Sequence, residues 1–176
     1  MPKIAVLQMN SGIDPEVNLD LIERAVEDAA KGGAELIFTP EMSVLLDRKR
    51  SRSAEWVESQ AVEEAVNRLA KRAIVSGIDI ALGSMPVACS SKRWANRSFF
   101  FRRNAGSASP ISYDKIHMFD VELSTGEAWR ESKAYEPGNE AVTIDDTPIG
   151  RLGLTICYDI RFPDLFNVLG LSLIHI

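Results

Sequence analysis

The feature that most limits the fold of this chain is an alternation of short apolar segments with a segment of helical periodicity near the start. The segments "KIAVLQM" (residues 3–9) and "AELIFTPE" (residues 34–41) are short and apolar, so they favour buried strands. Between them, Asp14 and Pro15 mark a helix start, and Gly32 and Gly33 mark its end. A strand, a helix and a second strand in this order predict a βα unit of an α/β protein.

The remaining sequence extends this pattern within one domain. Helical spacing of apolar residues predicts a helix over residues 61–76, and an apolar segment predicts a strand over 79–87. Two further strands are expected at 94–103 and 111–119, and a hairpin at 141–157. The 176 residues are 45% hydrophobic and 26% charged, an ordinary globular balance. Without a linker or repeat, residues 1–176 are read as a single domain.

Charge and the few cysteines and histidines exclude several functional classes. The formal net charge of −5 argues against a nucleic-acid partner, and the basic cluster "DRKRSRS" (residues 47–53) is read as a solvated loop. Two cysteines without C-x-x-C spacing and two histidines offer no metal-ligand set, and no cofactor is predicted. No segment has the length to cross a bilayer or the form of a signal peptide, so no membrane partner and a cytoplasmic location are expected.

Cys157 carries the main functional question. It follows the apolar segment "GLTI" and precedes Tyr158, Asp159 and Arg161. A free cysteine is often a buried core residue, and Cys157 alone fits that role. Its place where the chain leaves a predicted strand, before Pro163 at a helix start, also fits an exposed nucleophile on a strand-to-helix bend. The backbone N–H of Tyr158 would then face a developing oxyanion.

A nucleophilic cysteine needs a base, and three residues are candidates for its partners. His117 would give a Cys–His hydrolase. Glu41 ends a predicted strand, and Lys115 lies within the strand expected at 111–119. Each could instead be structural, as a solvated glutamate and a lysine with its stem along an apolar surface. The residues alone leave these readings open.

Three motifs together settle the class of protein that this sequence resembles. "FTPEM" around Glu41, "YDKIHMFD" around Lys115 and "GLTICYDIRFP" around Cys157 resemble, in the same order, the motifs of the nitrilase superfamily of carbon–nitrogen hydrolases. The sequences of these motifs are most similar to those of the amidase branch that includes omega-amidase and deaminated-glutathione amidase. The resemblance implies an α/β fold, the nitrilase-like α-β-β-α sandwich. It also implies a small-molecule amide substrate and homo-oligomers of the full-length form.

The resemblance also implies roles for individual residues. Cys157 is the expected nucleophile, Glu41 the general base, and Lys115 with the Tyr158 N–H the oxyanion donors. "GEAWRESKAYEPG" is similar to a family loop that carries a second glutamate, placed at Glu131. By its position four residues past Cys157 and its side-chain type, rather than by the resemblance, Arg161 could clamp a substrate carboxylate, or else pair with Asp159 or Asp164. The expected reaction is hydrolysis of an amide through a thioester, with ammonia released.

Two alternative functions remain open, and the C-terminal end of the chain raises a separate expectation. A nitrilase or an N-carbamoyl hydrolase would use the same triad, and a catalytically silent fragment would use none of it. The chain ends soon after Cys157, so the resemblance implies a sandwich that is incomplete at the C-terminus. The segment "GLSLIHI" (residues 170–176) departs from the family pattern and is read as a non-native tail. Open edges and uncovered apolar faces are then expected, with poor solubility or activity.

Overall fold

The computed structural model describes residues 1–106, 108–122, 124, 126 and 128–173 of the chain. The predicted βα unit is present as β1 (Ile4–Val6), α1 (Pro15–Lys31) and β2 (Leu36–Phe38), and the two strands pair in parallel. Asp14 caps α1, because its carboxylate accepts hydrogen bonds from the backbone N–H groups of Glu16 and Val17 at 3.0 and 3.3 Å.

A five-stranded sheet forms the centre of the molecule, in the order β1-β2-β3-β4-β5. The strands β3 (Asp79–Ala88), β4 (Trp94–Phe101) and β5 (Ile111–Asp114) follow one another as antiparallel neighbours. Because β4 reverses direction and β5 reverses it again, β5 runs in the same direction as β2. The C-terminal ends of β2 and β5 therefore lie at the same edge of the sheet, which is where the site residues emerge.

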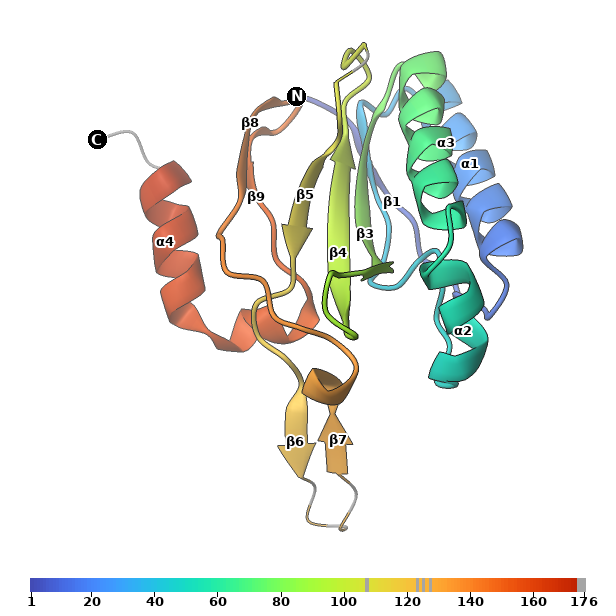
Figure 1. Ribbon diagram of the computed structural model, residues 1–176. Helices are drawn as coiled ribbons and strands as arrows, with labels where there is room; N and C mark the ends of the chain where they lie inside the picture. Colours follow the sequence, from blue (N-terminus) through green and yellow to red (C-terminus); the bar gives the residue numbers. More distant parts are fainter. Residues whose placement is uncertain (107, 123, 125, 127, 174–176) are drawn as a thin grey trace.

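Helices cover one face of this sheet, and a hairpin with a helix covers the other (Figure 1). On the first face, α1 and α3 (Ala61–Ser76) bury a core that includes Leu19, Ile22, Val26, Leu69 and Ile80. On the second face, β8 (Thr143–Thr147) pairs with β9 (Gly150–Gly153), and α4 (Pro163–Leu173) lies outside them. The order helix, sheet, hairpin, helix confirms the predicted nitrilase-like α/β sandwich.

Three local predictions were wrong. The basic cluster is a loop only over residues 47–49, because residues from Arg50 onward form α2 (Arg50–Val57), whose Val57 is buried beside Leu45 and Trp94. The strand expected at 111–119 ends at Asp114, and the chain then forms the hairpin of β6 (Asp120–Glu122) and β7 (Ala128–Arg130). The predicted hairpin at 141–157 stops at Gly153.

Large apolar side chains are exposed on several elements, and those on β1 and α4 bear on the expected open edges and faces. Ile4 and Val6 are exposed on the edge strand β1, and Phe166 and Val168 are exposed on α4. Gly170 continues α4, which ends at Leu173, and residues 174–176 of the segment read as a non-native tail lie outside the described part of the chain. The non-native origin of the tail stays a prediction.

Candidate active site

The position of Glu41 is set by the backbone that follows β2. Met42, the next residue, has a left-handed φ of 53°, and its N–H donates to the Ser84 hydroxyl at 2.9 Å. A Cβ atom at Gly83 would lie 2.3 Å from the Pro40 carbonyl oxygen, so only glycine allows β3 to approach this segment so closely. The strained backbone at Met42 and the close approach of Gly83 to Pro40 together fix the position of Glu41 at the edge of the sheet.

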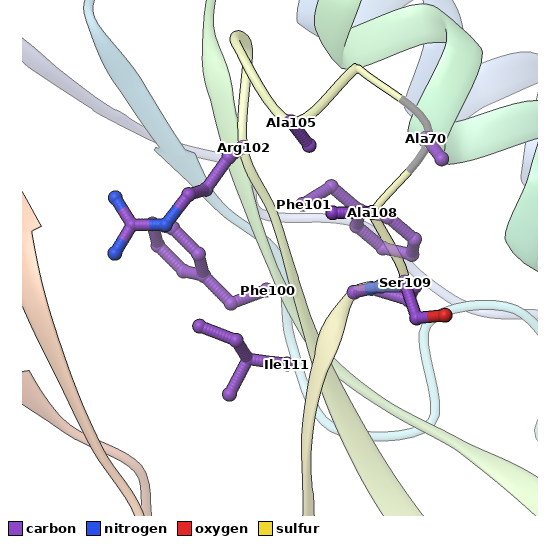
Figure 2. Close-up of a pocket in the computed structure, with 9 residues that line it drawn as sticks. Ala70, Phe100, Phe101, Arg102, Ala105, Ala108, Ser109 and Ile111 are labelled. Atoms are coloured by element: carbon purple, nitrogen blue, oxygen red, sulfur yellow. The ribbon is translucent and has the colours of Figure 1, made fainter.

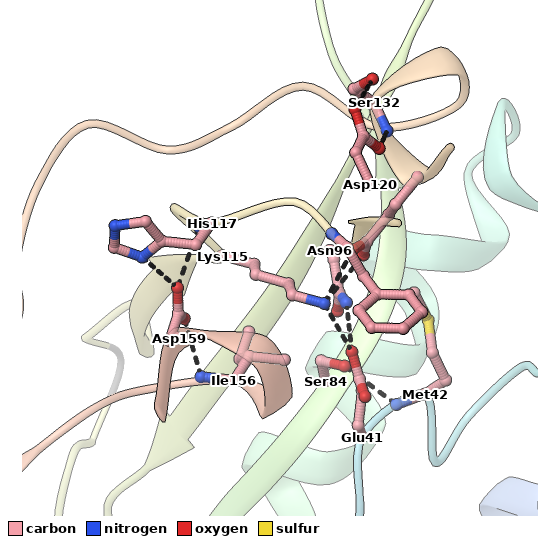
Figure 3. Close-up of polar contacts among 12 residues, drawn as sticks. Glu41, Met42, Ser84, Asn96, Lys115, His117, Asp120, Ser132, Ile156 and Asp159 are labelled. Carbon is pink, nitrogen blue, oxygen red and sulfur yellow. Dashed lines mark hydrogen bonds and ion pairs between the residues drawn. The ribbon is translucent and has the colours of Figure 1, made fainter. Parts of the chain in front are cut away.

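Lys115 lies one residue beyond β5, not in the middle of a strand as predicted, and its side chain is only 2% exposed. Its backbone N–H donates to the Asn96 carbonyl at 3.0 Å, and its carbonyl accepts from the Gly138 N–H at 2.9 Å. A Cβ atom at Gly138 would lie 2.3 Å from the Asp114 carbonyl oxygen. The backbone is therefore held on both sides of Lys115, and the ammonium points at the neighbouring strand ends (Figure 3).

The ammonium of Lys115 lies between two carboxylates. Its Nζ is 3.3 Å from Glu41 Oε1, and 3.0 and 2.9 Å from Glu131 Oε1 and Oε2. Burial opposes the charge, but the hydrogen bond to Glu131 and the charges of both carboxylates outweigh it, so the pKa of Lys115 is raised. The Phe119 N–H donates to Glu131 Oε2 at 2.6 Å and fixes that carboxylate. Lys115 is therefore a fixed positive charge.

Cys157 lies against this group of charges. It begins the short 3-10 helix η2 (Cys157–Arg161) with a φ of 48°, an uncommon conformation for a side chain other than glycine, and it is exposed. Burial of part of the thiol, the charge of Glu41 and a hydrogen bond to Glu41 raise its pKa, and Lys115 opposes them. The thiol is therefore neutral at pH 7 and has a carboxylate, not His117, as its hydrogen-bond partner.

Asp159 holds the turn of Cys157 in place, a role that the sequence analysis missed. Its carboxylate is fully buried and accepts from the Tyr113 hydroxyl at 2.7 Å and the Ile156 N–H at 2.9 Å. It also contacts the His117 N–H and Nδ1 at 2.9 and 2.8 Å. These contacts tie the turn that carries Cys157 to β5 and to the segment after Lys115. The sequence around Asp159 also contains Tyr158 and Arg161, so it gave no local signal that this carboxylate is buried.

The other predicted residues occupy the same turn. The Tyr158 ring packs edge-on against Phe119 and Phe162, with centroids 5.1 and 5.4 Å apart. Arg161 is exposed, and within the described residues it forms no ion pair with either Asp159 or Asp164. That alternative for Arg161 was therefore wrong. The oxyanion role of the Tyr158 N–H and the carboxylate role of Arg161 stay predictions.

The described part of the chain also contains cavities away from this group of residues. A cavity of about 200 Å³ lies at the turn between β4 and β5, and its walls contain none of the predicted site residues (Figure 2). Phe100, Phe101, Arg102 and Ile111 contribute to its lining. Within the residues that the structure describes, no group of three or more histidine, cysteine or acidic side chains could hold a metal ion. No helix in that part is long and apolar enough to span a membrane.

Comparison with known proteins identifies the family. The carbon-nitrogen hydrolase family profile matches residues 3–174, so the chain belongs to this family, as the motifs implied. Deaminated glutathione amidase of Yersinia enterocolitica is 38% identical over 170 residues, which cover 94% of this chain and 57% of that protein. The chain therefore spans about half the length of the curated relatives it matches.

Solved structures confirm the nitrilase-like fold. The C. elegans NitFhit protein superposes with a TM-score of 0.81 at 29% identity, over 94% of this chain and 41% of that one. An amidase from Nesterenkonia sp. AN1 superposes with a TM-score of 0.76 at 26% identity, over 94% of this chain and 61% of that one. Its structure shows the result of Michael addition of acrylamide at the active-site cysteine.

The contacts of Asp159 generate a prediction about stability. In Asp159→Asn, the amide N–H₂ would face groups that donate to the carboxylate, so buried donors lose their acceptor. We expect a loss of at least about 2 kcal/mol in the free energy of unfolding. Asp28→Asn, whose side chain is 79% exposed, is the matched control and should change little. Thermal unfolding followed by circular dichroism measures both, and equal midpoints would contradict the role of Asp159.

Proposed function

We propose that this chain is a thiol hydrolase that cleaves the amide C–N bond of a small carboxylate-bearing substrate and releases ammonia. The observation that carries the proposal is the meeting of Glu41, Lys115 and Cys157, because Glu41 and Lys115 are 74 residues apart in the chain. A neutral thiol beside a carboxylate and a buried ammonium supplies a nucleophile, a base and a positive charge for an oxyanion.

The first half of the reaction forms a thioester. The Sγ of Cys157 attacks the amide carbon while its proton passes to Glu41. The Lys115 ammonium and the Tyr158 N–H stabilise the oxyanion, and one such donor typically contributes about 100- to 1000-fold in rate. The C–N bond then breaks as Glu41 returns the proton to the nitrogen, which leaves as ammonia.

The second half of the reaction returns the enzyme to its starting state. Water attacks the thioester carbon and gives a proton to Glu41. The C–S bond breaks, and the sulfur regains the proton, so the sum is amide plus water giving carboxylic acid plus ammonia. Glu131, which touches Lys115 and not the thiol, keeps the ammonium oriented throughout.

The comparisons support the amide rather than other C–N bonds. A relative is named deaminated glutathione amidase, and the Nesterenkonia amidase carries its covalent adduct on a cysteine. The corresponding nucleophile here is Cys157, by its motif. A nitrilase or N-carbamoyl hydrolase remains the second candidate, and a panel of ω-amides, nitriles and N-carbamoyl acids distinguishes them by which substrate releases ammonia.

The two cysteines give a direct test of the nucleophile. Cys157→Ala should abolish ammonia release from ω-amides, whereas Cys89→Ala should leave it nearly unchanged. Burial raises the pKa of Cys89 to about 11, and this thiol hydrogen-bonds Glu136 instead of a site residue. A coupled ammonia assay measures both variants beside the wild type. Equal losses of ammonia release in the two variants would contradict Cys157 as the nucleophile. If the wild type releases no ammonia from any substrate, the catalytically silent alternative is favoured.

The charge of Glu41 makes a second prediction that needs no turnover. Glu41→Gln keeps the shape of the side chain but removes the charge that raises the pKa of Cys157. The thiolate then forms at lower pH, so the pH midpoint for alkylation of Cys157 by iodoacetamide should fall although amide hydrolysis is lost. Mass spectrometry of the labelled peptide measures it. Glu122→Gln, with a 72% exposed side chain, is the control, and an unchanged midpoint in Glu41→Gln would contradict the contact.

The substrate carboxylate is tested at Arg161. Arg161→Lys loses the planar fork of the guanidinium, so KM should rise for substrates with a free carboxylate and change little for the matching neutral amides. Steady-state kinetics on each pair of substrates measures the difference. A similar rise in KM for both members of a pair would show that Arg161 does not bind the carboxylate.

A further inference from the structure

Asn96 lies at the centre of the candidate active site, although the proposed mechanism does not use it. It is fully buried on β4, where pairing with Pro86 fixes its register. Its carbonyl oxygen accepts from the Lys115 N–H at 3.0 Å, and its side-chain Nδ2 donates to Glu41 Oε1 at 2.8 Å (Figure 3). One residue therefore contacts the backbone of the lysine and the carboxylate of the base.

Only one of the two polar atoms of the Asn96 side chain has a hydrogen-bond partner within the described residues. Its Oδ1 is buried and has no hydrogen-bond partner within the described part of the chain. A buried polar atom without a partner costs roughly 1 to 3 kcal/mol, so an apolar residue of the same size would suit this position better for stability alone. The one hydrogen bond that the side chain makes is to Glu41, and this contact explains why an amide is there.

The two carboxylate oxygens of Glu41 differ in the hydrogen bonds that they accept. Asn96 Nδ2 at 2.8 Å and Lys115 Nζ at 3.3 Å both contact Oε1. Within the described residues, no hydrogen bond from another protein nitrogen ends on Oε2. The Glu41 side chain is 33% exposed, whereas that of Lys115 is 2% exposed, so part of the carboxylate faces open space. An oxygen that already accepts two hydrogen bonds is the poorer acceptor for a proton.

We propose that Asn96 is a positioning residue that holds Oε1 of Glu41, so that Oε2 exchanges the proton with Cys157 and with the leaving nitrogen. This inference rests on the proposed amidase function. In the first half-reaction the proton moves from Sγ to Oε2 and then to the departing nitrogen, and in the second from water to Oε2 and back to Sγ. Asn96 gains and loses no proton, and it keeps the carboxylate from rotating.

The test uses the whole chain and follows alkylation of Cys157 over a pH series, because this readout needs no turnover. The charged groups that act on this thiol are Glu41, Lys115 and Glu131. In Asn96→Leu, the carboxylate of Glu41 is released from its place beside the thiol. We expect the pH midpoint of alkylation to fall, as in Glu41→Gln, and Asn96→Leu to add no further shift in the Glu41→Gln background.

The control is Ser98→Ala, which removes a buried hydroxyl two residues along the same strand that bonds the Leu82 carbonyl instead of Glu41. It should leave the alkylation midpoint unchanged. Asn96→Ala, which cannot clash, must shift the midpoint in the same direction as Asn96→Leu, and circular dichroism confirms that each variant is folded. No shift in either Asn96 variant, the same shift in Ser98→Ala, or a full additional shift in the double variant would overturn the proposal.

Turnover separates this inference from the proposed function. Amide hydrolysis needs a proton on the leaving nitrogen, whereas a p-nitrophenyl ester has a leaving group that needs none. Asn96→Leu should therefore slow ammonia release by about 10-fold or more and slow ester cleavage much less. Equal losses on both substrates would overturn proton positioning by Asn96. A wild-type chain that releases no ammonia, but shows the expected alkylation shifts, would reject the amidase and leave the placement of Glu41 by Asn96 supported.

Discussion

The buried ammonium of Lys115 is the interaction on which the rest of the site depends. A charge removed from water costs several kcal/mol unless partners compensate it. Here two carboxylates contact one nitrogen, and Glu131 is itself held by the Phe119 N–H. The pair Ser132 and Asp120 joins the base of the β6–β7 hairpin beside Glu131. The hairpin is therefore part of the site, because it carries the group that keeps the ammonium in place.

The backbone conformation at Met42 and Cys157 helps to fix the positions of the site residues. Met42 and Cys157 both have positive φ angles, and each lies next to, or is, a residue of the proposed triad. Such conformations cost about 1 to 3 kcal/mol and persist only where the surrounding structure enforces them. The close approach at Gly83 provides that support on the Glu41 side, and the buried carboxylate of Asp159 provides it on the Cys157 side. Stability elsewhere in the fold thus offsets the backbone strain at the residues of the proposed triad.

Sequence reasoning found the parts of this arrangement that are local. Apolar runs and glycine stops predicted the strands and helices, and the motifs placed Glu41, Lys115 and Cys157 together by resemblance. Asn96 and Asp159 were missed because their roles are contacts across 55 and 46 positions of the chain, and the resemblance assigned no role to either residue. The helix α2 was missed for a similar reason, since its amphipathic pattern is weak and its packing against Trp94 decides the conformation.

In the proposed reaction, the contrast between the two glutamates separates holding the ammonium from moving protons. Both oxygens of Glu131 are occupied, Oε1 by Lys115 and Oε2 by Lys115 and the Phe119 N–H, and its side chain is 15% exposed. Within the described residues, Glu41 has its two nitrogen donors on one oxygen, and its side chain is 33% exposed. In the proposal, the carboxylate with nitrogen donors on both oxygens holds the charge of Lys115, and the carboxylate with nitrogen donors on one oxygen accepts a proton from the thiol. The distribution of the nitrogen donors over the two oxygens, rather than the residue type, separates the two proposed roles.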